Sequence, residues 1–307
     1  MSNKPKQPLA DELKPFVAPF CFDGSGKFHL KSHKTDEKGG LDKQKGETII
    51  EANRGRLNDF QERLYAQDRW SLLLIFQGMD AAGKDSAIKS VFEGVDPQGC
   101  EVTAFKVPST KELDHDFLWR IAKALPERGR IGIFNRSHYE EVLVARVHTE
   151  ILARQRLPAQ VVTKGIWNER FKSIRNFESH LAANGVLILK FFLHVSREEQ
   201  RRRFLARLEE PGKRWKFDMN DVAERKLWDK YMQAYEDAIR HTSRPEAPWY
   251  VVPADNKGFA RLVIAEAMVE AMEGLRLEYP KVEGPALKEL EKVRRALLAE
   301  PKQRGKS

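Results

Sequence analysis

Cysteine is scarce in this sequence, with only Cys21 and Cys100 among 307 residues. The two cysteines lack the close spacing of metal-ligand or redox motifs and do not form a pattern of paired cysteines. We therefore expect neither a disulfide nor a zinc site, a composition typical of proteins from a reducing compartment.

Long hydrophobic runs are also missing. The longest, residues 186–195, is interrupted by Lys190 and is too short to span a bilayer. Residues 1–16, MSNKPKQPLADELKPF, lack the apolar core of a secretory signal. No internal repeat is present, and low complexity is confined to the tails. The sequence predicts a soluble, cytoplasmic protein without a membrane partner.

Positive charge is in excess, with 54 Lys and Arg against 45 Asp and Glu, a net charge of +9 and a pI near 9.4. Such an excess favours a polyanionic partner, which could be nucleic acid, an acidic membrane surface or a long phosphate polymer. Charge alone does not choose among them. The chain has no zinc finger, no aromatic RNA-binding signature and no helix-turn-helix pattern, so we expect no nucleic acid partner.

The length allows one large α/β domain with additions at its ends. Residues 1–45 lack sustained periodicity and predict an N-terminal arm. Residues 46–280 predict the main domain, with a helical lid at about 196–217. Residues 281–307 predict a peripheral helix and a basic tail.

Strand and helix patterns alternate along the main domain, which predicts a doubly wound, mostly parallel sheet. The expected strands are residues 72–76, 101–106, 131–134, 186–195 and 248–253. The expected helices are residues 47–67, 84–94, 110–124, 161–183, 197–210, 218–241 and 257–275.

The stretch SLLLIFQGMDAAGKDS combines a buried strand, a glycine-bracketed loop and the start of a helix. The spacing Gly78-x-x-x-x-Gly83-Lys84 lets backbone N–H groups curl around a phosphate, and the helix N-terminus and the lysine add positive charge. A glycine-rich turn with a surface lysine is the alternative, which the flanking strand and helix patterns disfavour. The candidate phosphate-binding residues of the loop are Gly78, Met79, Asp80, Ala81, Ala82, Gly83, Lys84, Asp85 and Ser86.

Two carboxylates crowd this anion site. Asp85 replaces the Ser or Thr that usually follows the loop lysine, and Asp80 lies inside the loop. Like charges about 4 Å apart repel by roughly 4 kcal/mol at an effective dielectric constant near 20, so we expect a cation between them and a phosphate. We infer Mg²⁺, with Asp80 as the better ligand. For Asp85, interaction with the helix N-terminus is an equally good explanation.

A second polar cluster, Asn135-Arg136-Ser137-His138, follows the strand at residues 131–134, where open α/β sheets bind ligands. Many phosphate-loop enzymes have a magnesium-binding aspartate at the position of Asn135. Arg136 suits bidentate phosphate binding, against the alternative of a surface ion pair. We interpret His138 as a structural hydrogen-bonding residue rather than a general base.

An arginine-rich helix follows the strand at residues 186–195. Ser196-x-x-Glu199 predicts a capping box at its start, and Pro211-Gly212 ends it. The pattern favours a lid that closes over phosphates, while a solvated basic helix paired with Glu209 and Glu210 is the alternative. The candidate phosphate contacts of this helix are Arg201, Arg202, Arg203 and Arg207.

Several motifs together resemble the polyphosphate kinase 2 family: FQGMDAAGKD, VFEGVDPQGCEVTAFKVPSTKELDHDFLWR, IFNRSHYEEVLVARVH, KFFLHVSREEQRRRFLAR and APWYVVPADN. The resemblance covers residues 57–279. It implies a three-layer P-loop kinase fold like that of thymidylate kinases, with a mostly parallel central sheet. It also implies Mg²⁺ as cofactor, phosphoryl transfer between inorganic polyphosphate and adenine or guanine nucleotides, and a homo-oligomer, either a dimer or a tetramer.

The resemblance also assigns residues. It makes residues 78–84 the Walker A loop, with Asp80 and Lys84 essential, and places Asn135 and Arg136 at the start of a Walker B-like segment. The setting FNRSHYE, with Asn where many members have Asp, resembles the branch that phosphorylates AMP as well as ADP. In that branch Glu140 would contact the nucleotide near the adenine.

For the reaction itself we expect in-line attack by a terminal phosphate oxygen of the nucleotide on the terminal phosphorus of the polymer. Lys84, Arg136 and the lid arginines would neutralise charge, and Lys106 would guide the polymer. An ATP-dependent nucleotide or small-molecule kinase would share these features but use another donor. A non-enzymatic nucleic-acid-binding protein would leave Asp80 and Asp85 unexplained.

Overall fold

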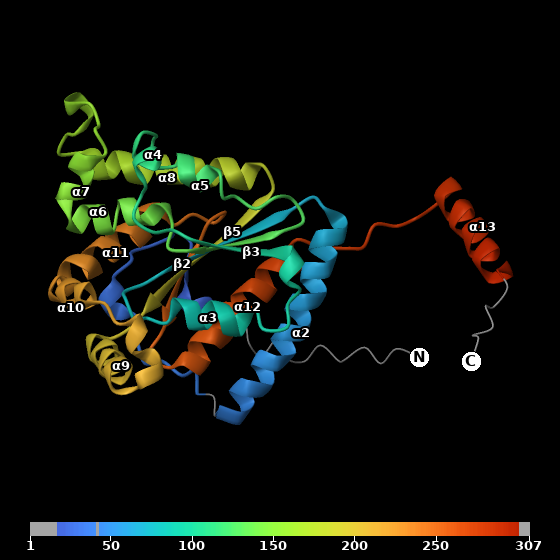
Figure 1. The fold of residues 1–307 in the computed structure, drawn as a ribbon, viewed down its shortest axis with the longest axis horizontal. Coiled ribbons are helices and arrows are strands. Elements are labelled where there is room, and N and C mark those ends of the chain that lie inside the picture. Colours follow the sequence, from blue (N-terminus) through green and yellow to red (C-terminus); the bar gives the residue numbers. More distant parts are fainter. Residues whose placement is uncertain (1–16, 41–42, 301–307) are drawn as a thin grey trace.

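The computed structural model describes residues 17–40 and 43–300 (Figure 1). Residues 1–16 of the expected arm and the basic tail after residue 300 lie outside the described residues. A six-stranded sheet crosses the centre of the molecule in the order β1-β6-β5-β2-β4-β3. The strands are β1 (Cys21–Phe22), β2 (Ser71–Gln77), β3 (Cys100–Ala104), β4 (Ile131–Asn135), β5 (Val186–His194) and β6 (Trp249–Pro253).

All strand pairs are parallel except β1 with β6, which confirms the mostly parallel α/β sheet. The chain leaves β2 toward β3 and β4 on one side and returns to β5 and β6 on the other. Open sheets bind ligands beyond the carboxyl ends of the strands where the order reverses in this way. The segment that follows β2 therefore lies at the expected ligand-binding edge.

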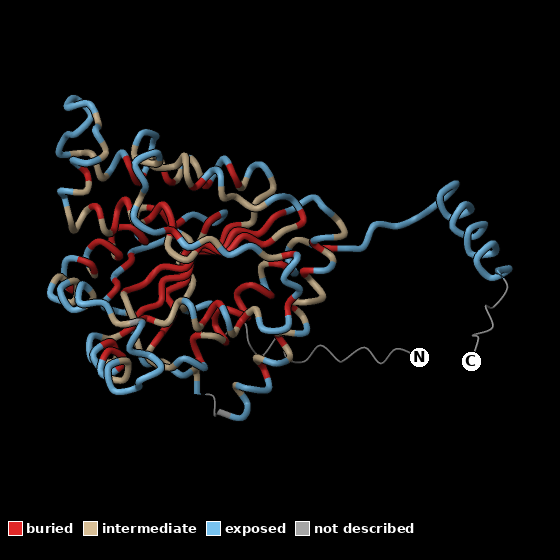
Figure 2. The backbone as a smooth tube through the Cα atoms, viewed as in Figure 1, coloured by how far each residue is buried: buried red, intermediate tan, exposed pale blue. Residues whose placement is uncertain are grey.

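Helices cover both faces of the sheet and produce the three layers (Figure 1). One layer contains α2 (Lys43–Gln67), α3 (Lys84–Val91) and α12 (Lys257–Gly274); the opposite layer contains α6 (Val144–Val147), α7 (Thr149–Arg154), α8 (Ile166–Ala183) and α11 (Trp228–Thr242). The strands between them form the buried centre shown in Figure 2. All seven residues of β2 are buried, because this strand has neighbours on both edges and helices on both faces.

Two of the expected helices are broken. The segment 110–124 forms α4 (Thr110–Leu113) and α5 (Trp119–Ala122), because Asp116 accepts a hydrogen bond from Leu118 N at 2.9 Å and starts a new turn. The segment 218–241 forms α10 (Met219–Lys226) and α11, which meet at Leu227, where the backbone leaves the helical region (φ −93°, ψ 14°).

Two other boundaries differ from expectation. The helix expected at 161–183 begins at Ile166, after a short 3₁₀ turn (Ala159–Val161). The strand expected at 101–106 ends at Ala104, where Phe105 N bonds to Asn135 O and turns the chain along the end of β4.

The segment predicted as a lid, residues 196–217, forms α9 (Arg197–Glu209) and the 3₁₀ helix η6 (Pro211–Lys216), and α10 follows it. Only half of the predicted capping box forms: Ser196 Oγ accepts from Glu199 N at 3.0 Å. The second bond of a capping box, from Ser196 N to the Glu199 side chain, does not form. Ser196 N donates to Asp255 at 2.8 Å instead, and the Glu199 carboxylate accepts from Arg202 and Arg203 of its own helix. Glu199 is thereby left to bind Arg203, which contacts the phosphate loop.

The two ends of the described chain differ in how they pack against the body of the molecule. Part of the segment before residue 46 belongs to the sheet, since β1 pairs with β6 and Phe28 and Leu30 are buried. At the other end, α13 (Pro285–Ala299) projects from the body and is exposed along its whole length (Figure 2). None of the helices in residues 17–40 and 43–300 is both long enough and apolar enough to cross a membrane.

Candidate active site

The phosphate loop connects β2 to α3 at the carboxyl edge of the sheet. Gly78 has φ +155°, and a Cβ there would lie 3.0 Å from the backbone oxygen of Leu193, so glycine lets the loop start against β5. Gly83 (φ +107°) precedes the first residue of α3. Met79 and Ala82 are buried, while Ser86 Oγ donates to Gly83 O at 2.9 Å. The predicted strand, loop and helix are all present.

Lys84 is the first residue of α3, and its Nζ donates to Gly78 O at 2.7 Å. The lysine thus folds back across its own loop. Burial lowers the pKa of Lys84, the charge of Arg136 lowers it further, and Asp80 and Glu140 oppose both effects. The ammonium group therefore lies in a poorly solvated position beside the loop carbonyls, where an anion would be strongly bound.

The loop and the end of β4 are joined by two side-chain contacts. Arg136 donates to Asp80 Oδ1 at 2.9 Å, and Asn135 Nδ2 donates to Asp85 Oδ1 at 2.6 Å. Arg136 also lies 3.6 Å from the carboxylate of Glu140. Burial raises the pKa of Glu140, while Arg136 and Lys84 counteract it. The structure thus brings together the loop residues and the strand-end residues that were predicted separately.

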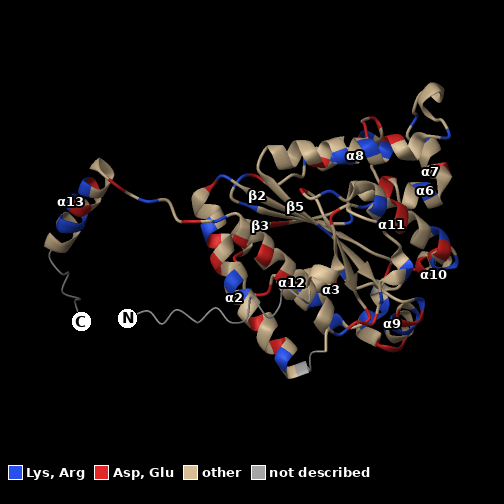
Figure 3. Ribbon diagram, turned by 180° about the vertical axis from the view of Figure 1, so that it is seen from behind, with Lys and Arg blue, Asp and Glu red and all other residues tan. Residues whose placement is uncertain are grey.

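The four predicted lid arginines have different surroundings. Basic and acidic residues both occur along α9 (Figure 3). Arg201 binds Glu198 and Arg202 binds Glu199, each pair within one turn of the helix, and both arginines are exposed. Arg207 lies 3.3 Å from Asp221 of α10. In the described structure these three contact acidic side chains rather than the loop.

Arg203 is buried and contacts the loop directly. Its Nη1 donates to the carbonyls of Ala81 (2.9 Å) and Ala82 (2.7 Å), and its Nη2 donates to Ala254 O at 2.6 Å and Asp255 O at 3.3 Å. Its Nε donates to Glu199 at 2.7 Å. All five N–H groups of the guanidinium are therefore used within the protein. These bonds also hold Ala81 in its left-handed conformation, with φ +60°.

Lys106 is exposed just beyond β3 and therefore lies at the same edge of the sheet. Its backbone carbonyl accepts from Arg120 Nη1 at 2.8 Å, which anchors α5 to the end of β3.

Comparison with known proteins decides the family. The model of the family described as "Polyphosphate kinase 2" matches residues 40–280. The chain belongs to the polyphosphate kinase 2 family. A relative from Rhodopseudomonas palustris, named ADP-polyphosphate phosphotransferase, is 54% identical over 244 residues, 79% of this chain and 84% of the relative. One from Meiothermus ruber, named AMP/ADP-polyphosphate phosphotransferase, is 45% identical over 84% of this chain and 93% of the relative.

The fold agrees with this membership. The crystal structure of polyphosphate kinase 2 from Arthrobacter aurescens TC1 superposes with a TM-score of 0.81 at 38% sequence identity, covering 88% of this chain and 94% of that one. The expected P-loop kinase architecture is thus confirmed for this member of the polyphosphate kinase 2 family.

The structure adds residues to the site that the sequence did not suggest. Gln200 donates to the backbone oxygen of Asp80 at 2.9 Å, so α9 holds the loop at a second point. Asp221 lies near Asp80, and burial together with that charge raises the pKa of Asp221 to about 6. Burial, reinforced by Glu140, raises the pKa of Tyr235 on α11. These residues carry no local motif, because they reach the site only through the packing of the lid and α11.

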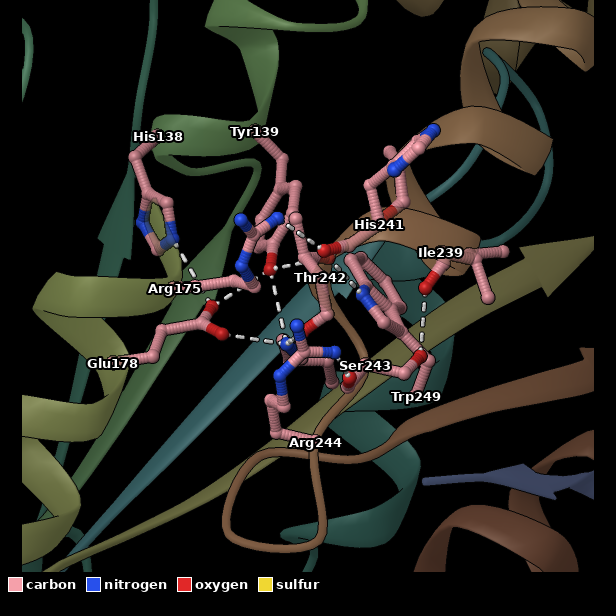
Figure 4. A network of polar contacts seen from close by, with 12 residues as sticks. His138, Tyr139, Arg175, Glu178, Ile239, His241, Thr242, Ser243, Arg244 and Trp249 are labelled. Atoms are coloured by element: carbon pink, nitrogen blue, oxygen red, sulfur yellow. Dashed lines mark hydrogen bonds and ion pairs between the residues drawn. The ribbon is translucent and has the colours of Figure 1, made fainter. Parts of the chain in front are cut away.

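A buried polar network lies directly behind the end of β4 (Figure 4). The carboxylate of Glu178 accepts from Tyr139 Oη at 2.7 Å and lies 3.3 Å from His138 Nε2. Lys190 Nζ donates to the same carboxylate, and Trp249 and Thr242 complete the group. His138 is fully buried here, which agrees with its interpretation as a structural hydrogen-bonding residue.

The donor set for a metal is small. Within the described parts of the chain, no group of three or more His, Cys, Asp or Glu side chains is arranged to hold a metal ion. In kinase sites, however, Mg²⁺ is bound by one or two carboxylates together with substrate phosphates. Asp80 and Asp85, at one edge with Lys84 and Arg136, fit that mode of binding and do not form a complete cage by themselves.

Proposed function

We propose that this chain transfers a phosphoryl group from inorganic polyphosphate to ADP, forming ATP, and also to AMP, forming ADP. The names of the relatives from R. palustris and M. ruber support both acceptors. The observation that carries the proposal for this chain is the pairing of Arg136 with Asp80 and of Asn135 with Asp85. These contacts hold a guanidinium and two carboxylates at the loop, beside Lys84, whose Nζ donates to Gly78 O, and this grouping supports phosphate binding there.

Charge neutralisation is the main chemical task in this reaction. A terminal phosphate oxygen of the nucleotide attacks the terminal phosphorus of the polymer in line, and the bond to the bridging oxygen breaks. The attacking oxygen is already anionic, so no general base is required. Lys84 and Arg136 bind phosphate oxygens, and the loop N–H groups orient them.

Mg²⁺ is the metal that this donor set and the reaction favour. When bound, it supplies positive charge to the phosphate oxygens, and Asp80 and Asp85 would hold it. Asn135 would orient Asp85 through its amide, a bond that an aspartate at this position could not donate.

The lid residues divide into two groups. Three arginines would bind the polymer by exchanging their acidic partners for phosphates: Arg201, Arg202 and Arg207. Lys106 would extend this positively charged edge. Arg203 acts on the loop and is a positioning residue, because its N–H groups are already used. Glu140, beside Arg136, would contact the nucleotide.

The same family membership leads us to propose a homo-oligomer, either a dimer or a tetramer. A nucleotide and polyphosphate as substrates, together with the free thiols of Cys21 and Cys100, support a cytoplasmic location.

The test is turnover with long-chain polyphosphate and Mg²⁺, offering ADP and AMP in separate reactions without added ATP. We expect ATP from ADP, and ADP followed by ATP from AMP. If neither forms while ATP phosphorylates AMP or another small acceptor, the chain is an ATP-dependent kinase. The Asn135→Asp variant should lose AMP turnover more than ADP turnover, and an unchanged ratio would refute the role of Asn135.

A further inference from the structure

Arg136 has a left-handed backbone conformation, with φ +64°. A residue with a Cβ is strained in this region, and such strain persists only where the surrounding structure fixes the backbone. The strained residue directly follows β4, and its guanidinium donates to Asp80 of the phosphate loop at 2.9 Å. The contacts that hold this conformation therefore also set the direction in which the arginine side chain leaves the end of the strand.

The backbone around Arg136 is held from inside the protein. Arg136 N donates to Phe76 O at 3.0 Å, which ties it to the neighbouring strand β2. The next residue, Ser137, is fully buried, and its Oγ accepts from Tyr139 N at 3.2 Å and from Gln77 Nε2 at 3.1 Å. The Arg136 side chain itself is 42% exposed, so its orientation depends on the buried backbone that carries it.

Gln77 is the last residue of β2 and immediately precedes the phosphate loop. It is buried, and its amide connects the end of β2 to Ser137 at the end of β4. Burial raises the pKa of Glu140, and the charge of Arg136 and a hydrogen bond from Gln77 counteract that shift. Gln77 thus contacts both the residue that follows Arg136 and the carboxylate that lies 3.6 Å from its guanidinium.

The segment after Ser137 is anchored by the buried network of Figure 4. Tyr139 Oη donates to Glu178 at 2.7 Å, and His138 Nε2 lies 3.3 Å from the same carboxylate. Three consecutive buried residues after Arg136 are therefore held by side-chain contacts. A backbone fixed in this way can retain a left-handed residue at its edge.

We propose that Gln77 and Ser137 are positioning residues, which hold Arg136 in its left-handed conformation and direct its guanidinium at the phosphates on the loop. The proposal rests on the proposed function, in which Arg136 binds phosphate oxygens. Both residues are buried and act on the reaction through Arg136. Because a small displacement of a charge-neutralising group slows a reaction strongly, their loss should appear in kcat.

The first test compares two fully buried serines. Ser137→Ala removes the acceptor for Gln77, and we expect about a tenfold lower kcat for ATP formation, with the KM values for ADP and polyphosphate unchanged. Ser243→Ala is the matched control, because Ser243 is equally buried at the end of α11 and its Oγ donates to Ile239 O at 2.7 Å. The control should keep the wild-type kcat. Thermal unfolding should shift similarly in both variants, since each loses one buried hydroxyl.

The second test removes the donor instead of the acceptor. Gln77→Met keeps an unbranched side chain of similar length and should lower kcat on the same scale as Ser137→Ala. Both substitutions are then combined with Arg136→Ala. In that background neither should lower kcat further, because no guanidinium remains to be positioned. A general loosening of the core would lower kcat in both backgrounds.

The proposal is overturned if both variants keep the wild-type kcat, if Ser243→Ala loses as much as Ser137→Ala, or if the losses multiply with that of Arg136→Ala. If the wild type forms no ATP from ADP and polyphosphate, the proposed function is wrong and the positioning role falls with it. An active wild type with unaffected variants rejects only the positioning role.

Discussion

Lys190 Nζ lies 2.6 Å from Glu178 Oε2, and neither side chain is more than 2% exposed. Lys190 points from β5 toward α8 and also donates to Tyr139 Oη at 3.0 Å and Thr242 O at 2.9 Å, so its three N–H groups are all used. Burial would raise the pKa of Glu178, but Lys190 and His138 hold it below its ordinary value. Burial lowers the pKa of Lys190, and Glu178 opposes that shift. The pair anchors the segment that follows Arg136.

We expect Lys190→Met to lower the free energy of unfolding by about 3–5 kcal/mol, because it leaves the Glu178 carboxylate buried without its partner. The double variant Lys190→Met/Glu178→Leu should cost clearly less, since neither charge then remains in the core. Urea unfolding of the three proteins measures both values. Equal losses of unfolding free energy in the single and double variants would show that the broken ion pair does not cause the destabilisation.

Arg203→Lys should destabilise the phosphate loop. A lysine cannot reach Ala81 O, Ala82 O and Ala254 O together, so we expect a loss of about 2–4 kcal/mol in unfolding free energy and about a tenfold lower kcat. Arg197→Lys is the matched control, because Arg197 is exposed at the start of the same helix and is not one of the predicted phosphate contacts. Thermal unfolding and turnover should be near those of the wild type in the control. Similar losses in both variants would contradict the positioning role.

Lys84→Ala should lower kcat by at least about a hundredfold, because the Nζ beside Gly78 O provides charge at the phosphates. Lys89→Ala removes a lysine from the exposed side of the same helix and should leave turnover unchanged. Both variants should keep the wild-type circular dichroism spectrum. Retained activity in Lys84→Ala would refute the assignment of this loop.

His194 should make stability depend on pH. Burial, reinforced by His33, lowers the pKa of His194 to about 4. The unfolded chain binds a proton at this imidazole below about pH 6.5, and the folded chain does so only near pH 4, so stability is lost as the pH falls through this window.

His194→Leu should remove this dependence, so that the variant gains roughly 3 kcal/mol relative to the wild type between pH 7 and pH 4. Urea unfolding at several pH values measures the difference. His180→Leu, which removes an exposed histidine, is the control. Wild-type and His194→Leu curves that run parallel across this pH range would disprove the effect.

Local pattern was sufficient for part of the fold. The apolar run at 72–76 and the spacing from Gly78 to Lys84 predicted β2, the phosphate loop and α3, because strand burial, glycine conformation and helix initiation act within a few residues. The central strand at 186–195 was predicted for the same reason. The helix expected at 110–124 was wrong, because the Asp116 side chain starts a new turn in place of the continuous helix.

What each polar side chain contacts depended on residues far away in the chain. The sequence assigned Arg203 the same phosphate-binding role as Arg201 and Arg202, yet it alone of the three reaches Ala81 and Ala82, more than 100 positions earlier. Glu199 was predicted to cap its helix and instead binds that arginine.

The sequence by itself determined the strand, loop and helix that bind phosphate, the parallel sheet, and the positions of Asn135 and Arg136 at its carboxyl edge. Only the tertiary structure decided which arginine holds the loop, that Lys190 is paired inside the core, and that Gln77 and Ser137 join the ends of β2 and β4. The physical reason is that hydrophobic periodicity and backbone conformation are local. Hydrogen-bond and ion-pair partners are instead selected by the packing of distant elements.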